Sequence, residues 1–310
     1  MGDWKDTKWA FMDGKIVPIN EANINIRTSA FQYGTSVFEG IRAYWNNDME
    51  KLFLFRVKEH YERMINNAKI LNMTVQYSAD ELVKSTIDLL KKENFKEDTY
   101  VRPNAYFASE NLLSKLDNKD YGFSIFSFPM GAHHDLDKGS NVIISSWAAS
   151  NDNSISPRGK IGGRYVNICL IILEYITLGY DDAIILSGSD QHVSEGAGQN
   201  IIIFRKGKFI TPPPSDNILE GITLESISTI IRDELGMELI ERSIDRTELY
   251  QSDEILFCGT GIQVTPVTIV DNRKIADGKP GKHTKEIQRL YFDIVRGKND
   301  KYKKWLTEIK

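Results

Sequence analysis

The fold class predicted from this sequence is a two-domain protein that mixes α-helices and β-strands. The chain has 310 residues, which is long for one hydrophobic core and suits two domains of ordinary size. Strand-like and helix-like patterns alternate along both halves, and a polar, turn-rich stretch at 129–141 separates them. We therefore expect a smaller N-terminal domain at 1–128, a connection at 129–141 and a larger C-terminal domain at 142–310.

The N-terminal half alternates short strands with amphipathic helices. Apolar side chains at helical spacing predict a helix over 58–71. Ser78 followed by Glu81 is a capping-box pattern, so a second helix begins there. The strands expected in this half are 53–56, 99–107 and 121–128.

The C-terminal half repeats this alternation. A long apolar helix is expected over 164–178, ended by Gly179 in the usual position after the last helical residue. Three prolines at 212–214 predict a stiff loop. The remaining helices are expected at 223–235 and 284–295, and the strands at 142–147, 183–186, 201–204 and 254–258.

Composition excludes several classes of protein. With 41% hydrophobic residues, 26% charged residues and a net charge of −4, the chain has no basic footprint for nucleic acid. No apolar run is long enough to cross a membrane, and the N-terminus lacks the apolar core of a targeting signal. Cys169 and Cys258 are too few for a disulfide framework, so a cytoplasmic location is expected.

Lys160 is the first candidate for chemistry. It stands among Gly159, Gly162 and Gly163 at the entrance of the apolar helix. Glycines permit positive backbone angles and let another group approach the main chain closely. A cation at the positive end of a helix is mildly unfavourable, so we expect this amine to be placed for condensation with a carbonyl group. A solvated surface lysine is the alternative.

Three segments are candidates for binding phosphate. The amides of Ile222 and Thr223 open a helix, where unpaired N–H groups attract anions. Thr260 lies between two glycines after a strand, as in an anion nest. Arg63 offers a bidentate guanidinium. Each segment by itself is also compatible with an ordinary helix cap, turn or surface charge.

Glu195 is a further candidate for contact with a cofactor. Glu195 is surrounded by small residues. If it lay against the nitrogen of a pyridine ring, its carboxylate would keep that nitrogen protonated. A solvated glutamate in a surface turn is the alternative.

Two other motifs are rejected. Residues 278–284 resemble a phosphate loop, but the glycines are too close together. His133 and His134 are adjacent and rarely ligate one ion, so we expect no metal site.

With these features taken together, the chain resembles the class IV aminotransferases, and most closely the branched-chain amino acid aminotransferases among them. The resemblance runs from about residue 11 to 295. It is carried by YGTSVFEGIR (33–42), FRVKEHYERM (55–64), YVRP (100–103), GKIGGRYVN (159–167), SEGAGQN (194–200), LEGIT (219–223) and GTGIQVTPV (259–267). It implies a two-domain fold of type IV, like that of D-amino acid aminotransferase, with pyridoxal 5'-phosphate (PLP) as cofactor.

The resemblance also implies a role for each matching residue. Lys160 would form the aldimine with PLP and move the substrate proton, and Glu195 would pair with the pyridine nitrogen. Arg102 would bind the γ-carboxylate of 2-oxoglutarate. The other cofactor residues would be Arg63, Tyr165, Leu219, Ile222, Thr223 and Thr260, and the other substrate residues Tyr33, Phe38, Gly40, Tyr100, Met130, Gly261 and Ile262.

The implied reaction is transamination of leucine, isoleucine and valine with 2-oxoglutarate, in two half-reactions. The partners are small amino acids and 2-oxo acids, and the implied assembly is a homodimer at least. Alternatives of the same fold are a D-amino acid or (R)-amine aminotransferase and aminodeoxychorismate lyase; a catalytically silent PLP-binding protein is another. Departures from the family pattern are Met130 for tryptophan, Arg164 for asparagine, Glu220 for proline and Gln263 for glutamate.

Overall fold

The computed structural model describes residues 6–111, 115–117, 119–131 and 137–309. The chain forms two compact units: unit 1 comprises Met1–Gly131, Gly159–Gly163 and Asp293–Lys310, and unit 2 comprises Ala132–Arg158 and Arg164–Phe292. These units differ from the expected domains because two segments of the C-terminal half join unit 1. The last strand pairs there with Lys51–Phe55, and Ile161 forms a bridge to Val37.

Unit 1 is built on one antiparallel sheet in the order β17-β5-β4-β6-β7-β1-β2, with β3 paired to β6. Its strands are β1 (Trp9–Met12), β2 (Lys15–Pro18), β3 (Ser36–Phe38), β4 (Ile41–Asn46), β5 (Lys51–Phe55), β6 (Thr99–Phe107), β7 (Tyr121–Pro129) and β17 (Leu306–Ile309). Its helices are α1 (Ser29–Tyr33), α2 (Val57–Ala68) and α3 (Ala79–Glu93).

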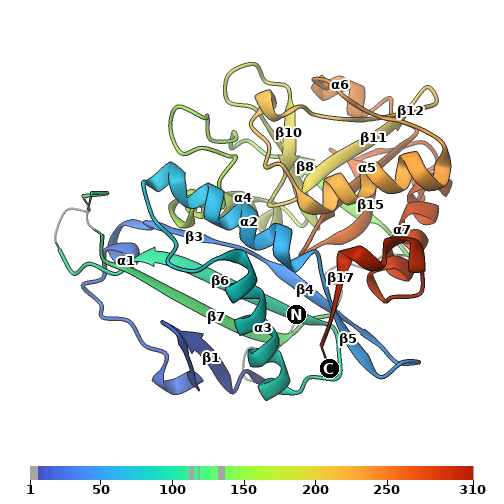
Figure 1. Cartoon of the computed structure of the whole chain (residues 1–310). Helices are drawn as coiled ribbons and strands as arrows, with labels where there is room; N and C mark the ends of the chain where they lie inside the picture. The colour runs from blue at the N-terminus through green and yellow to red at the C-terminus, as the bar shows by residue number, and fades with distance from the viewer. Residues whose placement is uncertain (1–5, 112–114, 118, 132–136, 310) are drawn as a thin grey trace. The chain divides into compact units, whose positions relative to one another are not determined.

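Helices α2 and α3 lie side by side against one face of this sheet (Figure 1). Tyr61 and Met64 of α2 and Leu82 of α3 are fully buried in the core that they share with the strands. The predicted capping box is confirmed, since the Ser78 side chain accepts from the Glu81 amide and the Glu81 carboxylate accepts from the Ser78 amide. The helical spacing of apolar residues in α2 and the capping box at the start of α3 are therefore the local signals that define the two helices covering the sheet.

Unit 2 is built on a mixed sheet in the order β10-β9-β8-β15-β14-β11-β12-β13, with β16 paired to β15. Its strands are β8 (Ser140–Ile144), β9 (Asp182–Leu186), β10 (Val193–Gly196), β11 (Asn200–Arg205), β12 (Lys208–Thr211), β13 (Leu239–Glu241), β14 (Glu254–Gly259), β15 (Gln263–Val270) and β16 (Arg273–Lys274). Its helices are α4 (Tyr165–Thr177), α5 (Ile222–Leu235), α6 (Arg246–Leu249) and α7 (Lys282–Val295), of which the end of α7 from Asp293 belongs to unit 1.

Alternation along β9 separates two apolar clusters of unit 2. Ile184 and Leu186 enter the main core, whereas Ala183 and Ile185 contact helix α4, as expected for successive side chains of a strand. Helix α4 connects β8 to β9, which run parallel, and Gly179 after it has a φ of +79°. The predicted helix end is therefore confirmed.

The long predicted elements are present, with boundaries shifted by a few residues. Strand 99–107 matches β6, and the strand expected at 142–147 is β8 (Ser140–Ile144). Several strands were not predicted, among them the short β1 and β2 and the longer β15. Strand β15 contains Pro266, which lies opposite Leu256 in the ladder, and proline is a poor strand signal. Within the described residues, no helix is long and apolar enough to span a membrane.

Candidate active site

The glycine-flanked segment Gly159–Gly163 pairs with the strand that carries Phe38. The Phe38 amide donates to the Lys160 carbonyl at 3.0 Å, and the Gly163 amide donates to the Gly34 carbonyl at 2.9 Å. A Cβ on Gly162 would lie 2.3 Å from Ser36 Oγ. None of the three glycines of this segment has a positive φ angle. They are therefore needed because the backbone is approached closely, and not because it adopts a left-handed conformation.

Lys160 and Arg102 share one aromatic neighbour. Lys160 Nζ lies 5.4 Å from the centroid of the Phe38 ring, and the Arg102 guanidinium carbon lies 4.4 Å from the same centroid. Arg102 Nη2 donates to Tyr100 Oη at 3.0 Å. Arg102 Nε is buried and has no hydrogen-bond partner within the described residues, so this guanidinium retains a donor for an anionic ligand.

Two further substrate candidates of unit 1, Gly40 and Met130, pack against Tyr100. A Cβ on Gly40 would lie 2.1 Å from Tyr100 Oη, so only glycine fits beneath the phenol. Met130 is buried with Tyr100 in a small apolar cluster. Arg42 donates to the carbonyls of Met130 and Gly131 at 2.9 and 3.0 Å and holds this segment in place.

Arg63, predicted to bind phosphate, forms a buried ion pair that sequence analysis missed. Its Nε and Nη2 donate to the Glu39 carboxylate at 2.7 and 2.8 Å, and the His60 imidazole is 2.9 Å from Glu39 Oε2. Burial would raise the pKa of Glu39, but Arg63 and His60 hold it well below its usual range. Burial lowers the pKa of His60. Glu39 therefore remains an anion that orients Arg63.

In unit 2, Glu195 is buried and does not lie in a solvated turn. Its Oε1 accepts from Arg164 Nη2 at 2.8 Å, and its Oε2 accepts from the Leu219 amide at 3.0 Å. Arg164 Nε also donates to Ser150 Oγ at 3.1 Å. Arg164 was identified from the sequence only as a departure from the family pattern, whereas here it fixes the carboxylate. A carboxylate has about four acceptor positions, so Glu195 retains capacity for another donor.

The two predicted anion segments of unit 2 have the expected local form. Helix α5 begins at Ile222 with Gly221 as its N-cap, and no side chain caps it. A Cβ on Gly221 would lie 2.0 Å from Asn200 Oδ1, so this glycine permits close packing. Thr260–Ile262 forms the turn between β14 and β15. Both segments therefore present main-chain donors at predicted positions.

Asp182 is a buried carboxylate beside this part of unit 2. It accepts from Gln199 Nε2 at 2.8 Å and from the Ala183 amide at 2.7 Å. Burial raises its pKa to about 7, although these hydrogen bonds oppose the shift. Gln199 in turn lies against Gly196, whose amide donates to the Gln199 carbonyl at 2.7 Å, so Asp182 supports the turn that follows Glu195. The sequence signal was weak, since Asp182 simply begins an apolar strand.

In the segment 278–284, which resembles a phosphate loop, a carboxylate of the protein accepts the main-chain hydrogen bonds. Glu254 accepts from the His283 and Thr284 amides at 3.1 and 2.8 Å, so a carboxylate already caps the start of α7. These contacts give the segment a role as a helix start. His133 and His134 lie outside the described residues.

Comparisons with known proteins identify relatives of the whole chain. The family described as amino-transferase class IV matches residues 36–270. A probable branched-chain-amino-acid aminotransferase of Aquifex aeolicus is 48% identical and covers 97% of this chain and 96% of its own length. The branched-chain-amino-acid aminotransferase of Pseudomonas aeruginosa is 35% identical, with 96% of each chain covered.

Solved structures agree with these relatives. A branched-chain aminotransferase of Thermoproteus uzoniensis, determined with norvaline, has a TM-score of 0.94 and 37% identity, covering 98% of this chain and 100% of its own. The Thermobaculum terrenum enzyme in its PLP form has a TM-score of 0.93 and 32% identity, with 98% and 99% covered. The expected fold is therefore confirmed.

Proposed function

This chain belongs to the amino-transferase class IV family, and we propose that it transfers the amino group of leucine, isoleucine and valine to 2-oxoglutarate with PLP as cofactor. The observation that carries this proposal is the placement of Lys160 and Arg102 against the same ring of Phe38. An amine for proton transfer and a guanidinium for a second carboxylate thus share one neighbourhood.

The residues present suit PLP. When bound, PLP supplies a protonated pyridine ring that accepts electron density from the substrate's α-carbon. Glu195 would hold the ring nitrogen protonated, since Arg164 and the Leu219 amide fix its two oxygens and leave acceptor capacity. Arg63 and the donors of the α5 start and the β14–β15 turn would hold the phosphate. Tyr165 would bind the ring hydroxyl, and Leu219 would pack against the ring.

Lys160 would carry the proton in each half-reaction. As a neutral amine, its Nζ accepts the proton from the substrate's α-carbon and later returns one. The backbone hydrogen bond from Phe38 to Lys160 fixes the start of this side chain. The turn amides of Gly261 and Ile262 would receive the substrate's α-carboxylate.

Arg102 would let one pocket accept both substrates. The Phe38 and Tyr100 rings lie 4.4 and 5.3 Å from its guanidinium and offer an apolar wall to an aliphatic side chain. The buried Nε without a partner offers a hydrogen bond to a γ-carboxylate. Tyr33, Gly40 and Met130 would complete the wall.

The direct test is the rate of glutamate formation from 2-oxoglutarate and each branched-chain amino acid. Lys160→Ala should lower kcat/KM at least about a thousandfold, because it removes the proton carrier. The exposed Lys279→Ala is the matched control and should keep full activity. Equal activity of the wild type and Lys160→Ala, or activity only with D-alanine or an (R)-amine, would overturn the proposal.

Arg102→Lys separates the two substrates. Lysine keeps the positive charge but loses the planar fork, so KM for 2-oxoglutarate should rise about tenfold while KM for leucine changes less. An equal rise for both substrates would assign Arg102 to the wall of the pocket rather than to the γ-carboxylate.

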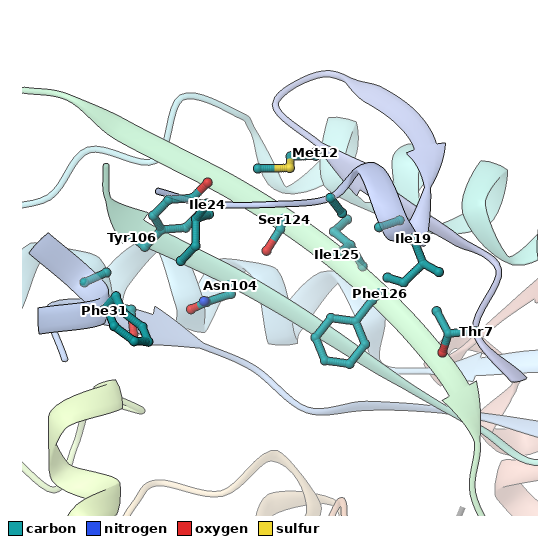
Figure 2. A pocket seen from close by; sticks show the side chains of 14 residues that line it. Thr7, Met12, Ile19, Ile24, Phe31, Asn104, Tyr106, Ser124, Ile125 and Phe126 are labelled. Carbon is teal, nitrogen blue, oxygen red and sulfur yellow. The ribbon is translucent and has the colours of Figure 1, made fainter. Parts of the chain in front are cut away.

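We propose that the protein is a homodimer and that it is located in the cytoplasm. Unit 1 has an apolar cavity of about 540 Å³ lined by residues of its first 36 positions and of β6 and β7, and Figure 2 shows Phe31, Ile24, Tyr106 and Phe126 around it. Phe31 lines this cavity and is 66% exposed, and exposed apolar surface that is continuous with an apolar cavity is typical of a contact between proteins. Light scattering should give twice the chain mass, and Phe31→Glu should weaken the dimer.

A further inference from the structure

Unit 2 contains a cluster of potential metal ligands, none of which has a role in the transamination proposed above. Asp190, His192 and Asp216 each offer one ligand atom, and these atoms lie within 4.8 Å of one another. Asp190 and His192 come from the β9–β10 connection, whereas Asp216 ends the short 3-10 helix Pro214–Asp216. The fold therefore brings two segments together at this cluster.

Asp216 is the residue that points to a ligand. It is 3% exposed, and its Oδ2 has no hydrogen-bond partner within the described part of the chain. The ion-pair contact that the structure gives it is to His192, at 4.0 Å from Nδ1 to Oδ1. A buried carboxylate oxygen without a hydrogen-bond donor is costly. A bound cation would satisfy it.

His192 has the arrangement common to metal-binding histidines. Its Nδ1 is buried and lacks a hydrogen-bond partner among the described residues. Its Nε2 lies 3.6 Å from Asp245 Oδ1, which places a second carboxylate behind the ring. In proteins the nitrogen of a ligating histidine that does not bind the metal usually faces such a carboxylate, which orients the ring.

The frame around the cluster is built from hydrogen bonds. The Ser187 amide donates to the His192 carbonyl at 2.7 Å, and Ser194 Oγ donates to the Asn217 carbonyl at 3.0 Å. Asn217 Nδ2 also donates to Ser187 Oγ at 3.2 Å. The residues on either side of His192 and Asp216 are thus fixed, while the exposed Asp190 can rotate to complete a site.

We propose that Asp190, His192 and Asp216 bind one divalent transition-metal ion. An imidazole with two carboxylates suits zinc, cobalt, nickel or manganese better than calcium or magnesium. Zinc binds such ligands at about 2.0–2.2 Å, so the ligand atoms must approach one another from their present separations of up to 4.8 Å, a movement that the exposed Asp190 can supply. The site goes beyond the transamination proposed above and does not depend on it.

The ion joins the two segments that lead to the cofactor carboxylate. His192 precedes Glu195 by three residues, and Asp216 precedes Leu219 by three residues. Leu219 donates its amide hydrogen to Glu195. A metal ion at the cluster therefore stabilises the pairing of these segments, and its removal loosens it.

The test uses the tag-free, PLP-loaded chain, first treated with a chelator. Titration calorimetry with Zn²⁺ and visible absorption with Co²⁺ should give one ion per chain. Asp216→Asn and His192→Ala should each abolish this binding, and Asp245→Asn should weaken it about tenfold. Asp152→Asn, an exposed acid of the same unit, is the matched control and should bind as the wild type does.

Thermal unfolding provides a second reading. Zn²⁺ should raise the Tm of the wild type but not that of Asp216→Asn. Without metal, Asp216→Asn should unfold at the wild-type temperature or above it, because it removes an uncompensated buried charge. Since PLP is present in every variant, metal that binds to the cofactor does not affect the comparison. Equal binding by the wild type and Asp216→Asn would overturn the proposal.

Discussion

Glu39 in unit 1 and Asp182 in unit 2 are both buried carboxylates, yet they differ in charge. Glu39 contacts Arg63 and His60, which hold its pKa low in spite of burial. The hydrogen bonds that oppose the shift of Asp182 come from neutral amides, and burial raises its pKa to about 7. The difference teaches that the charge of the partner, more than burial, decides ionisation. Glu39 is a permanent anion that orients Arg63, whereas Asp182 titrates near neutral pH.

Breaking the Glu39 pair should have the largest effect on stability. Glu39→Gln leaves the Arg63 guanidinium without its anion, so the free energy of unfolding should fall by about 3–5 kcal/mol. The control is Asp88→Asn, which breaks the exposed Lys84–Asp88 pair of α3 and should cost less than about 0.5 kcal/mol. Urea unfolding measures both. Similar small losses would mean that Glu39 and Arg63 are not a coupled pair.

Asp182 should make stability fall as pH rises. Its folded-state pKa of about 7 lies above the unfolded value of 3.8, so the folded chain binds the extra proton between these values. Its contribution is fully present below about pH 4 and is lost as pH rises to about 7, by an amount on the order of 4 kcal/mol.

The variant Asp182→Asn should remove that dependence. We expect the difference in unfolding free energy between the wild type and Asp182→Asn to change between about pH 4 and pH 7 and to level off above that, with the variant gaining relative stability as pH rises. Gln199 can turn its amide to accept from the new side chain. A difference that stays constant over this range would show that Asp182 is ionised throughout.

Replacing His60 should have the smallest effect of the three. His60→Leu removes one hydrogen bond to a charged group, which costs about 2 kcal/mol. His60→Asn keeps a donor near the position of Nδ1 and should lose less. If both variants lose the same amount, packing rather than the bond to Glu39 explains the role of this histidine.

Local signals made parts of the fold predictable. The capping box of Ser78 and Glu81 involves residues three apart and was confirmed, as was the strand Thr99–Phe107. The pairing of β17 with β5 joins residues about 250 positions apart, and no local pattern reports such a contact. The expected C-terminal domain at 142–310 therefore includes two segments, Gly159–Gly163 and Asp293–Lys310, that belong to unit 1.

The same distinction applies to the site. Lys160 and Glu195 were recognisable because motifs surround them. Glu39 and Arg164 were not, since each matters through a partner more than twenty residues away. Asp216 and His192 are also far apart in sequence, and the geometry of the folded chain was needed to connect them.

The half-reaction is the most direct test of the proposed activity. The absorption spectrum of the PLP-loaded protein would be recorded while L-leucine, L-glutamate, D-alanine and (R)-phenylethylamine are added separately. We predict rapid conversion to the pyridoxamine form with L-leucine and L-glutamate and little change with the other two. Conversion by D-alanine or the amine alone would contradict branched-chain specificity, and no conversion by any of them would contradict transamination itself.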